Sequence, residues 1–237
     1  MNAQNIFEKR DFTDSEKNKL LYNILFPEKS CDDKLYPIVL FLHGAGERGN
    51  DNEKSLTHIK ELFLNAENKK NYPTFVIVPQ CPEDERWVEV SWKLETHIKP
   101  EIASKSMNST IQLLNYLIEN FPIDKNRIYI TGLSMGGFGT WDAICRYPDF
   151  FAAAIPICGG GDENTASQIV NIPIWAFHGD NDKAVNVSRS RNMINALRKA
   201  GGNPKYTEYK GVGHGSWINA YRETELLKWL FSNKKAN

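Results

Sequence analysis

The sequence predicts an α/β protein in which a mostly parallel central sheet is flanked by helices. Short, almost purely apolar segments of strand length alternate along the chain with longer segments whose apolar residues recur at helical spacing. Continuous apolar runs are typical of parallel strands, because these strands are buried on both faces between layers of helices. A chain of 237 residues with 41% hydrophobic side chains can bury one such core. We therefore expect residues 1–237 to form a single domain.

The predicted strands follow from the apolar runs. An early strand is expected at 20–26 (LLYNILF), where it ends at Pro27. The near-continuous apolar runs that come after it are expected to be buried parallel strands: 37–42, 74–78, 127–131, 152–157 and 172–177. Residues 206–209 are expected to form the last strand.

Helices are predicted between and after these strands. Apolar residues recur at helical spacing from Ile111 to Phe121, and Pro122 ends that helix. Further helices are expected at 138–147, around 193–197 with an end near Gly201 and Gly202, and at 226–231.

Composition and charge argue against several classes of protein. The 29 Lys and Arg balance the 29 Asp and Glu, so the chain lacks the positive charge with which proteins bind nucleic acid phosphates. No apolar run approaches the roughly 18 residues that could span a bilayer, so we expect a soluble protein that inserts in no membrane. The first residues lack the features of a signal peptide. The chain as read is expected in the cytoplasm, or in the periplasm or outside the cell if a signal has been trimmed from it.

The cysteines do not indicate a redox or zinc motif. Cys31, Cys81, Cys145 and Cys158 lie too far apart for C-x-x-C spacing. They are also too few to cross-link a small secreted scaffold. We expect them to be mostly core thiols.

A G-x-S-x-G pentapeptide, 132–136, directly follows the predicted strand 127–131 and precedes a predicted helix. In that context the pattern places a serine on a strained turn above the sheet. The glycines on either side, Gly132 and Gly136, are needed because the turn brings neighbouring chain close, where a Cβ would clash. Ser134 is therefore the predicted nucleophile.

A serine nucleophile needs a histidine base and a carboxylate that orients the histidine. Asp180 and Asp182 follow the predicted strand 172–177, and His214 follows the last strand, so the partners come in the order that this architecture requires. Both lie beyond the carboxyl ends of strands, where open α/β sheets place their sites. Asp182 fits the spacing H-G-x-x-D-x-x-V that begins at His178, which leaves Asp180 as a turn or capping residue.

The segment His43-Gly44-Ala45-Gly46 follows the predicted strand 37–42 and completes the site. We expect an oxyanion hole formed by the main-chain N–H groups of Met135 and Ala45. A metal is not expected, because the sequence has no H-E-x-x-H and no histidine pair at helical ligand spacing. His43 and His178 are instead expected to hold loop main chain through ring hydrogen bonds.

The residues that line the substrate pocket are less tightly specified. The polar and aromatic stretch at about 82–104 fits neither period, and we expect it to form a pocket wall, since long loops in compact domains are often functional. Trp87 and Trp92 in this stretch, and Trp217 near His214, either wall the pocket or pack beneath it. Two further residues, Glu47 and Arg48, are either polar groups of the pocket or a surface ion pair.

With these motifs the chain resembles the α/β-hydrolase superfamily, and within it the small serine esterases of the carboxylesterase, feruloyl esterase and "predicted peptidase" group, which is related to prolyl oligopeptidase catalytic domains. The matching segments cover most of the chain: FLHGAGERG, VPQCP, IYITGLSMGGFGTWD, YPDFFAAAIPICGGGD, WAFHGDNDKAV and YKGVGHGSW. The resemblance implies that Ser134 is the nucleophile, Asp182 the acid and His214 the base. It also implies an α/β-hydrolase fold without a large lid domain.

We therefore expect a serine hydrolase of carboxylic esters, active through an acyl-enzyme and without a cofactor. The expected partner is a small-molecule or carbohydrate-linked ester with a short-chain or aromatic acyl group, such as acetyl or feruloyl. Two alternatives remain: a serine peptidase of the prolyl oligopeptidase-like group, and a non-catalytic binding protein on a hydrolase scaffold. The sequence indicates no oligomeric state.

Overall fold

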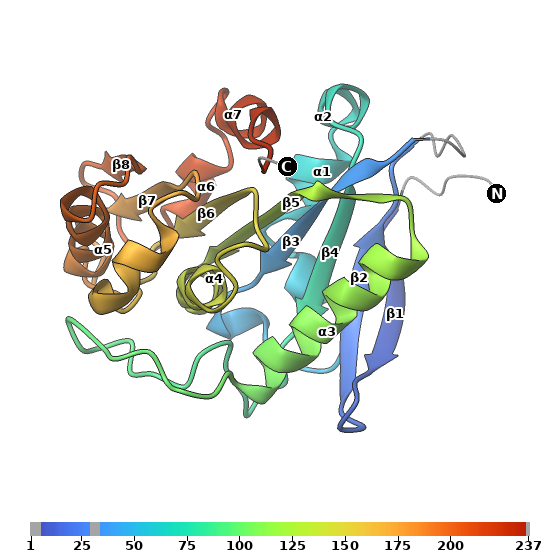
Figure 1. Cartoon of the computed structure of the whole chain (residues 1–237), viewed down its shortest axis with the longest axis horizontal. Helices are drawn as coiled ribbons and strands as arrows, with labels where there is room; N and C mark the ends of the chain where they lie inside the picture. The colour runs from blue at the N-terminus through green and yellow to red at the C-terminus, as the bar shows by residue number, and fades with distance from the viewer. Residues whose placement is uncertain (1–5, 29–33, 236–237) are drawn as a thin grey trace.

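The computed structural model describes residues 6–28 and 34–235. An eight-stranded sheet runs through it in the order β1-β2-β4-β3-β5-β6-β7-β8 (Figure 1). The pairs β1–β2 and β2–β4 are antiparallel, and the other neighbouring strands pair in parallel. The predicted fold class, a mostly parallel sheet flanked by helices, is confirmed.

The elements have the following bounds. The strands are β1 (Glu8–Thr13), β2 (Lys19–Leu25), β3 (Tyr36–Leu42), β4 (Phe75–Gln80), β5 (Ile123–Leu133), β6 (Ala153–Ile157), β7 (Trp175–Gly179) and β8 (Lys205–Tyr209). The α-helices are α1 (Lys60–Leu64), α2 (Ala66–Asn71), α3 (Lys105–Asn120), α4 (Met135–Arg146), α5 (Ser188–Lys199), α6 (Trp217–Ala220) and α7 (Leu226–Ser232). Short 3-10 helices are η1 (Ala45–Glu47), η2 (Lys54–Leu56) and η3 (Glu163–Ile169).

Each predicted strand has a counterpart, but β1 was not predicted. It lies at the edge of the sheet, where it pairs only with β2, and its residues alternate between half-buried and exposed. No apolar run therefore marks it in the sequence.

Helix α3 begins well before the predicted start at Ile111, because Ser104 caps it by accepting a hydrogen bond from the N–H of Met107 at 3.1 Å. The short helices α1, α2 and α6 were not predicted. No helix in the described part of the chain is both long enough and apolar enough to cross a bilayer.

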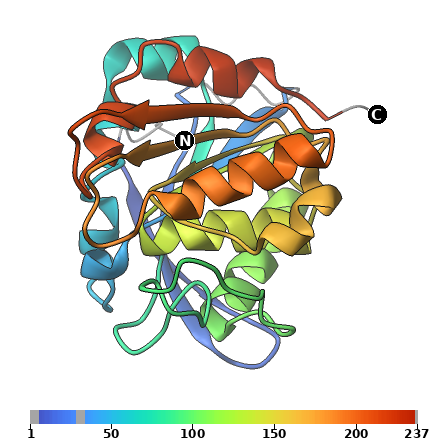
Figure 2. The ribbon, with the colours of Figure 1, turned by 90° about the vertical axis from the view of Figure 1, so that its left-hand side faces the viewer.

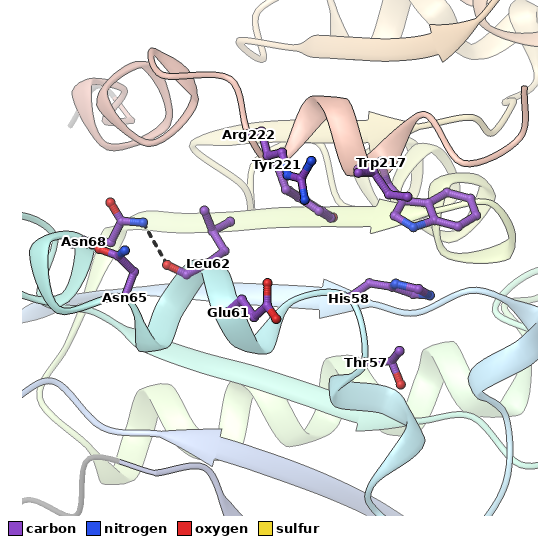
Figure 3. Close-up of a pocket in the computed structure, with 10 residues that line it drawn as sticks. Thr57, His58, Glu61, Leu62, Asn65, Asn68, Trp217, Tyr221 and Arg222 are labelled. Atoms are coloured by element: carbon purple, nitrogen blue, oxygen red, sulfur yellow. Dashed lines mark hydrogen bonds between the residues drawn. The ribbon is translucent and has the colours of Figure 1, made fainter. Parts of the chain in front are cut away.

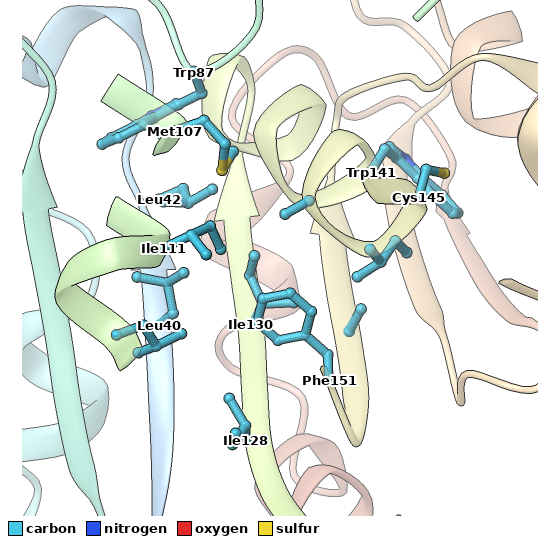
Figure 4. Packing of buried hydrophobic residues seen from close by; sticks show 14 of the residues in the cluster. Leu40, Leu42, Trp87, Met107, Ile111, Ile128, Ile130, Trp141, Cys145 and Phe151 are labelled. Carbon is cyan, nitrogen blue, oxygen red and sulfur yellow. The ribbon is translucent and has the colours of Figure 1, made fainter. Parts of the chain in front are cut away.

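Alternate residues of the central strands face two separate apolar layers. Leu40 and Leu42 of β3 face the layer under α3 and α4 (Figure 4), whereas Val39 and Phe41 face the layer under α1 and α7. Figure 2 shows the corresponding arrangement of the helices, with α7 and the α1–α2 segment on one side of the strands and α4 and α5 on the other. Burial on both faces fixes the carboxyl ends of the central strands, where the candidate site lies.

The segment at about 82–104 has no helix or strand and runs beside α4 as an extended loop (Figure 1, lower left). The guanidinium group of Arg146 in α4 donates hydrogen bonds to the main-chain carbonyls of 100–102, at 2.6, 3.0 and 3.4 Å. The N–H of Lys99 donates to the carboxylate of Asp162 at 2.8 Å. The position of this loop thus depends on contacts with its main chain.

The cysteines that the structure describes are buried and free, as predicted. Burial raises the thiol pKa to about 12 in Cys81 and Cys158 and to about 11 in Cys145. The side chains therefore remain neutral thiols near pH 7. Cys31 lies outside the described residues.

Candidate active site

Ser134 lies on the sharp turn between β5 and α4, with φ 52° and ψ −116°, a conformation that residues other than glycine seldom adopt. Its N–H donates to the carbonyl of Ile157 at 2.9 Å. A Cβ on Gly132 would lie 2.3 Å from the carbonyl oxygen of Gly136, and a Cβ on Gly136 would lie 1.8 Å from that of Leu42. Because these contacts exclude any side chain, packing explains the glycines of the G-x-S-x-G pattern.

A line of hydrogen bonds joins Ser134 to His214 and His214 to Asp182. The Nε2 atom of His214 lies 2.9 Å from the Ser134 Oγ, and its Nδ1 atom lies 2.7 Å from Oδ2 of Asp182. A carboxylate beside Nδ1 keeps the proton on that nitrogen, so Nε2 is free to accept the serine proton. The structure thus brings the three residues together, from the loops after β5, β7 and β8.

The Asp182 carboxylate is fully buried and accepts hydrogen bonds at both oxygens. Its Oδ1 accepts from the N–H groups of Ala184 and Val185 at 2.8 and 2.9 Å, and Oδ2 accepts from His214. Burial alone would raise the pKa of Asp182, but the hydrogen bonds from His178, His214 and Val185 outweigh it and hold the pKa well below its ordinary value. Asp182 therefore stays ionised at neutral pH.

His178 contacts this carboxylate, which the sequence analysis did not foresee. Its ring is completely buried, with Nε2 3.2 Å from Oδ2 of Asp182 and 3.0 Å from the carbonyl of Val185. Both neighbours are acceptors, so Nε2 carries a proton. The Nδ1 atom lies 2.7 Å from Oγ of Ser190. His178 holds the loop main chain as expected, and it also orients the Asp182 carboxylate.

Asp180, the alternative acid, lies elsewhere in the same loop. It is exposed, and its Oδ1 accepts a hydrogen bond from the N–H of Gly211 at 2.6 Å. Its own N–H donates to the carbonyl of Tyr209 at 3.1 Å. These contacts connect the loop after β7 to the loop after β8, so Asp180 has a structural role.

The expected oxyanion donors, Ala45 and Met135, are the first residues of η1 and α4. The N–H groups of a first helical turn have no acceptor within their own helix, so both are available to an incoming oxygen.

His43 fixes the loop that carries Ala45. Its Nδ1–H donates to the carbonyl of Gly44 at 2.7 Å, and Nε2 accepts the N–H of Cys81 at 3.0 Å. Burial lowers the pKa of His43 to about 4, so the ring is neutral.

Two tryptophans of the 82–104 segment were candidates for a pocket wall. Trp87 is fully buried, and its indole N–H donates to the carbonyl of His43 at 2.9 Å. It therefore packs beneath the oxyanion loop, and its candidacy as a wall was wrong. Trp92 is partly exposed and packs against the core, with the guanidinium carbon of Arg86 4.7 Å from its ring centroid.

Glu47 and Arg48 form no ion pair with each other. The Glu47 carboxylate lies 3.3 Å from Nε2 of His58, and Arg48 donates to the carbonyls of Ala45 at 3.0 Å and Glu85 at 3.3 Å. Arg48 thus connects the oxyanion loop to the 82–104 segment, and Glu47 connects it to the segment before α1.

Trp217 lies beside His214 and at one end of a groove. Its ring centroid lies 5.4 Å from that of His214 and 5.2 Å from that of His58. The groove has a volume of about 380 Å³ and runs between the α1–α2 segment and α6 (Figure 3). The sequence analysis did not predict it, because its other lining residues carry no motif and come from distant parts of the chain.

One cluster in the described residues has the composition of a metal site. Ligand atoms of Cys158, Asp182 and His214 lie within 4.8 Å of one another. Both ring nitrogens of His214 are already hydrogen bonded, and the raised pKa of Cys158 keeps its sulfur protonated, which makes it a poor ligand. The arrangement fits a hydrogen-bonded serine, histidine and aspartate better than a metal centre.

The fold and this hydrogen-bonded line are those of an α/β-hydrolase. The sequence profile of the phospholipase/carboxylesterase family matches residues 29–225, and the chain belongs to this family.

Several proteins resemble this chain. A solved structure described as a thermostable esterase is 40% identical, with a TM-score of 0.89 over 97% of this chain and 63% of its own. A probable carboxylesterase SOBER1-like of Arabidopsis thaliana is 25% identical over 85% of this chain and 80% of its own length. A bifunctional acetylxylan esterase/xylanase of Neocallimastix patriciarum is 27% identical over 68% of this chain, which spans 22% of that protein.

Replacing Asp182 with asparagine is expected to lower kcat by about 10⁴-fold, because an amide NH₂ beside Nδ1 of His214 favours the wrong imidazole tautomer. Asp180→Asn is the matched control, since it keeps the oxygen that accepts from Gly211 and should change kcat little. The measurement is kcat of folded, purified variants on 4-nitrophenyl acetate. A larger loss in the Asp180 variant would move the acid to that residue.

The neutral, buried His43 predicts a specific pH dependence of stability. Its pKa is about 4 in the folded protein against 6.5 when exposed, so the unfolded chain binds a proton that the folded protein does not. The contribution of the neutral His43 ring to the free energy of unfolding is fully present above pH 6.5. It is lost as the pH falls toward 4, to a total of about 3 kcal/mol. Urea unfolding between pH 7.5 and 4 should therefore show that the free energy of unfolding falls more steeply with decreasing pH in the wild type than in His43→Gln. Equal slopes would contradict the assignment.

Proposed function

We propose that the protein is a serine hydrolase of carboxylic esters that acts through a covalent acyl-enzyme. The observation that carries this proposal is the line of hydrogen bonds from Ser134 through His214 to the ionised Asp182. Membership of the phospholipase/carboxylesterase family and 40% identity to a thermostable esterase support it.

In the proposed reaction, Oγ of Ser134 attacks the ester carbonyl while Nε2 of His214 takes its proton. Asp182 stabilises the imidazolium that forms. The main-chain N–H groups of Met135 and Ala45 bind the carbonyl oxygen as it becomes negative, and each such donor contributes typically ~2.7–4 kcal/mol to the transition state. His214 then gives its proton to the departing alcohol. A water molecule activated by the same histidine releases the acid, so these groups supply every proton transfer without a cofactor.

The proposed substrates are esters of short-chain or aromatic acids, including esters carried on carbohydrate. A relative named as an acetylxylan esterase supports an acetyl group on a sugar as one candidate. The peptidase alternative is less favoured, because the family and the 40% identical structure are described as esterases. The non-catalytic alternative is less favoured because His214 lies within hydrogen-bond distance of both Ser134 and Asp182.

Ser134→Ala is expected to abolish turnover of 4-nitrophenyl acetate while circular dichroism stays unchanged. Without the nucleophile only the oxyanion donors and substrate binding remain, which typically give ~10³–10⁴-fold over water. Ser167→Ala, at an exposed serine of η3, is the matched control and should keep full activity. Near-wild-type kcat in the Ser134 variant would refute the proposed mechanism.

We expect kcat/KM to favour acetyl to butyryl or flat aromatic acyl groups over long chains. One methylene in a fitting apolar pocket changes the transition-state energy by about 1–3 kcal/mol at most, so the preference should fall gradually over several carbons. A series of 4-nitrophenyl esters from acetate to palmitate measures it. Trp92→Ala should weaken the preference if the ring touches the acyl group, and should lower only the melting temperature if the ring is purely core. A wild-type preference for palmitate would contradict the short-chain proposal.

A further inference from the structure

The groove beside Trp217 is a hollow that the proposed mechanism does not use. Its lining includes Thr57, Glu61, Asn68, Tyr221 and Arg222, together with the ring of Trp217. We propose that this groove binds the alcohol part of the ester, and that the alcohol is an uncharged polyhydroxylated compound, a sugar residue or a short chain of them. This inference rests on the proposed esterase function and adds to it a binding site and a substrate class.

The first argument is where the groove begins. At one end Trp217 packs against His214, and His58 pairs with Glu47 of the oxyanion loop. Figure 3 shows Trp217 and His58 together at that end and Asn65 and Asn68 at the other. The groove therefore starts beside two parts of the catalytic machinery and leads away from them.

The second argument concerns which half of the ester lies there. The leaving oxygen must approach Nε2 of His214 to receive its proton, so the alcohol lies on the histidine side of the scissile bond. The groove begins with a ring packed on that same histidine. It is thus placed for the alcohol, whereas the acyl group lies on the other side of the carbonyl.

The third argument is the chemistry of the lining. Trp217 and Tyr221 contribute aromatic rings to the lining, and aromatic rings suit the C–H faces of a sugar ring. Among the described residues, the side chains of Glu61 and Arg222 have no hydrogen bond or ion pair within the protein, and Asn68 donates to the carbonyl of Leu62 at 2.9 Å (Figure 3), which leaves its oxygen free to accept. The groove therefore offers both acceptors and donors, and the negative charge of Glu61 balances the positive charge of Arg222.

These groups favour a hydroxylated alcohol over a fatty one. An alkyl chain in the groove would remove Glu61 and Arg222 from water without replacing their hydrogen bonds, which is unfavourable. Sugar hydroxyls both donate and accept, so they can satisfy both side chains.

The groove also continues beyond a single ligand position. A second hollow of about 350 Å³ shares Leu62, Asn68, Tyr221 and Arg222 with the first. Each volume lies in the range of about 300–1,000 Å³ that is common for ligand sites. An alcohol of more than one sugar unit therefore has room along α6.

The test compares two esters of the same acid. Mono-O-acetylated xylotriose carries the proposed alcohol, and 4-nitrophenyl acetate does not. In the double variant Glu61→Ala/Arg222→Ala we expect kcat/KM for the xylotriose ester to fall at least tenfold, mainly through KM, while kcat/KM for 4-nitrophenyl acetate stays within twofold. Free xylotriose should inhibit hydrolysis of 4-nitrophenyl acetate competitively by the wild type and not by the variant.

The matched control is Glu119→Ala/Arg198→Ala, which removes one exposed acid from α3 and one exposed base from α5, outside the groove. It should leave both substrates unaffected. Equal loss on both esters in the groove variant, or no loss on either, would overturn the assignment of the groove. If the wild type hydrolyses 4-nitrophenyl acetate but prefers ethyl acetate to the xylotriose ester, the sugar assignment fails and the esterase function stands. If the wild type hydrolyses no ester, the proposed function itself fails.

Discussion

The arrangement of the site depends on one main-chain contact, the packing of the first turn of α4 on the end of β3. At Gly136 nothing separates the two main chains, since a Cβ there would lie 1.8 Å from the carbonyl oxygen of Leu42 and 2.8 Å from that of His43. This approach sets the start of α4 directly against the loop that carries Ala45. Any side chain at position 136 would push the helix away and move Ser134 with it. Ser134 keeps its rare backbone conformation because the strands and helix on either side of it are fixed.

Two buried histidines hold the remaining loops, and they do so with opposite ring nitrogens protonated. His43 donates through Nδ1 and accepts at Nε2, whereas His178 donates through Nε2 toward the Asp182 carboxylate. The His43 ring connects the loop after β3 to Cys81 after β4, and the His178 ring connects the loop after β7 to Ser190 of α5. Donors and acceptors that are fixed before the substrate arrives need little rearrangement during the reaction. This preorganisation is the main source of electrostatic stabilisation of the transition state in such sites.

The features that could be predicted from the sequence are those that local chemistry or burial determines. The central strands are visible because both of their faces are buried, and the turn at Ser134 is visible because close packing requires its glycines. The edge strand β1 has no such constraint. Trp87 shows the limit for aromatic residues, since a ring that walls a pocket and a ring that lies under a loop look the same in sequence, and only the hydrogen bond to His43 separates them. The groove beside Trp217 is lined by α6 and by the α1–α2 segment, which are distant in sequence.

The outer part of the 82–104 segment, 99–102, is held through its main chain, whereas the inner part is anchored by the buried side chain of Trp87. Arg146 binds three successive carbonyls, and Asp162 binds an N–H, so these anchors would survive most substitutions in the loop. Three large apolar residues of the segment, Leu94, Ile98 and Ile102, are 58%, 81% and 82% exposed and contribute little to the core. The outer surface of such a loop can change while the sheet and the Ser134, His214 and Asp182 side chains stay as they are. Related enzymes could therefore diverge in what they bind near α4 by accumulating substitutions in this segment, at small cost in stability.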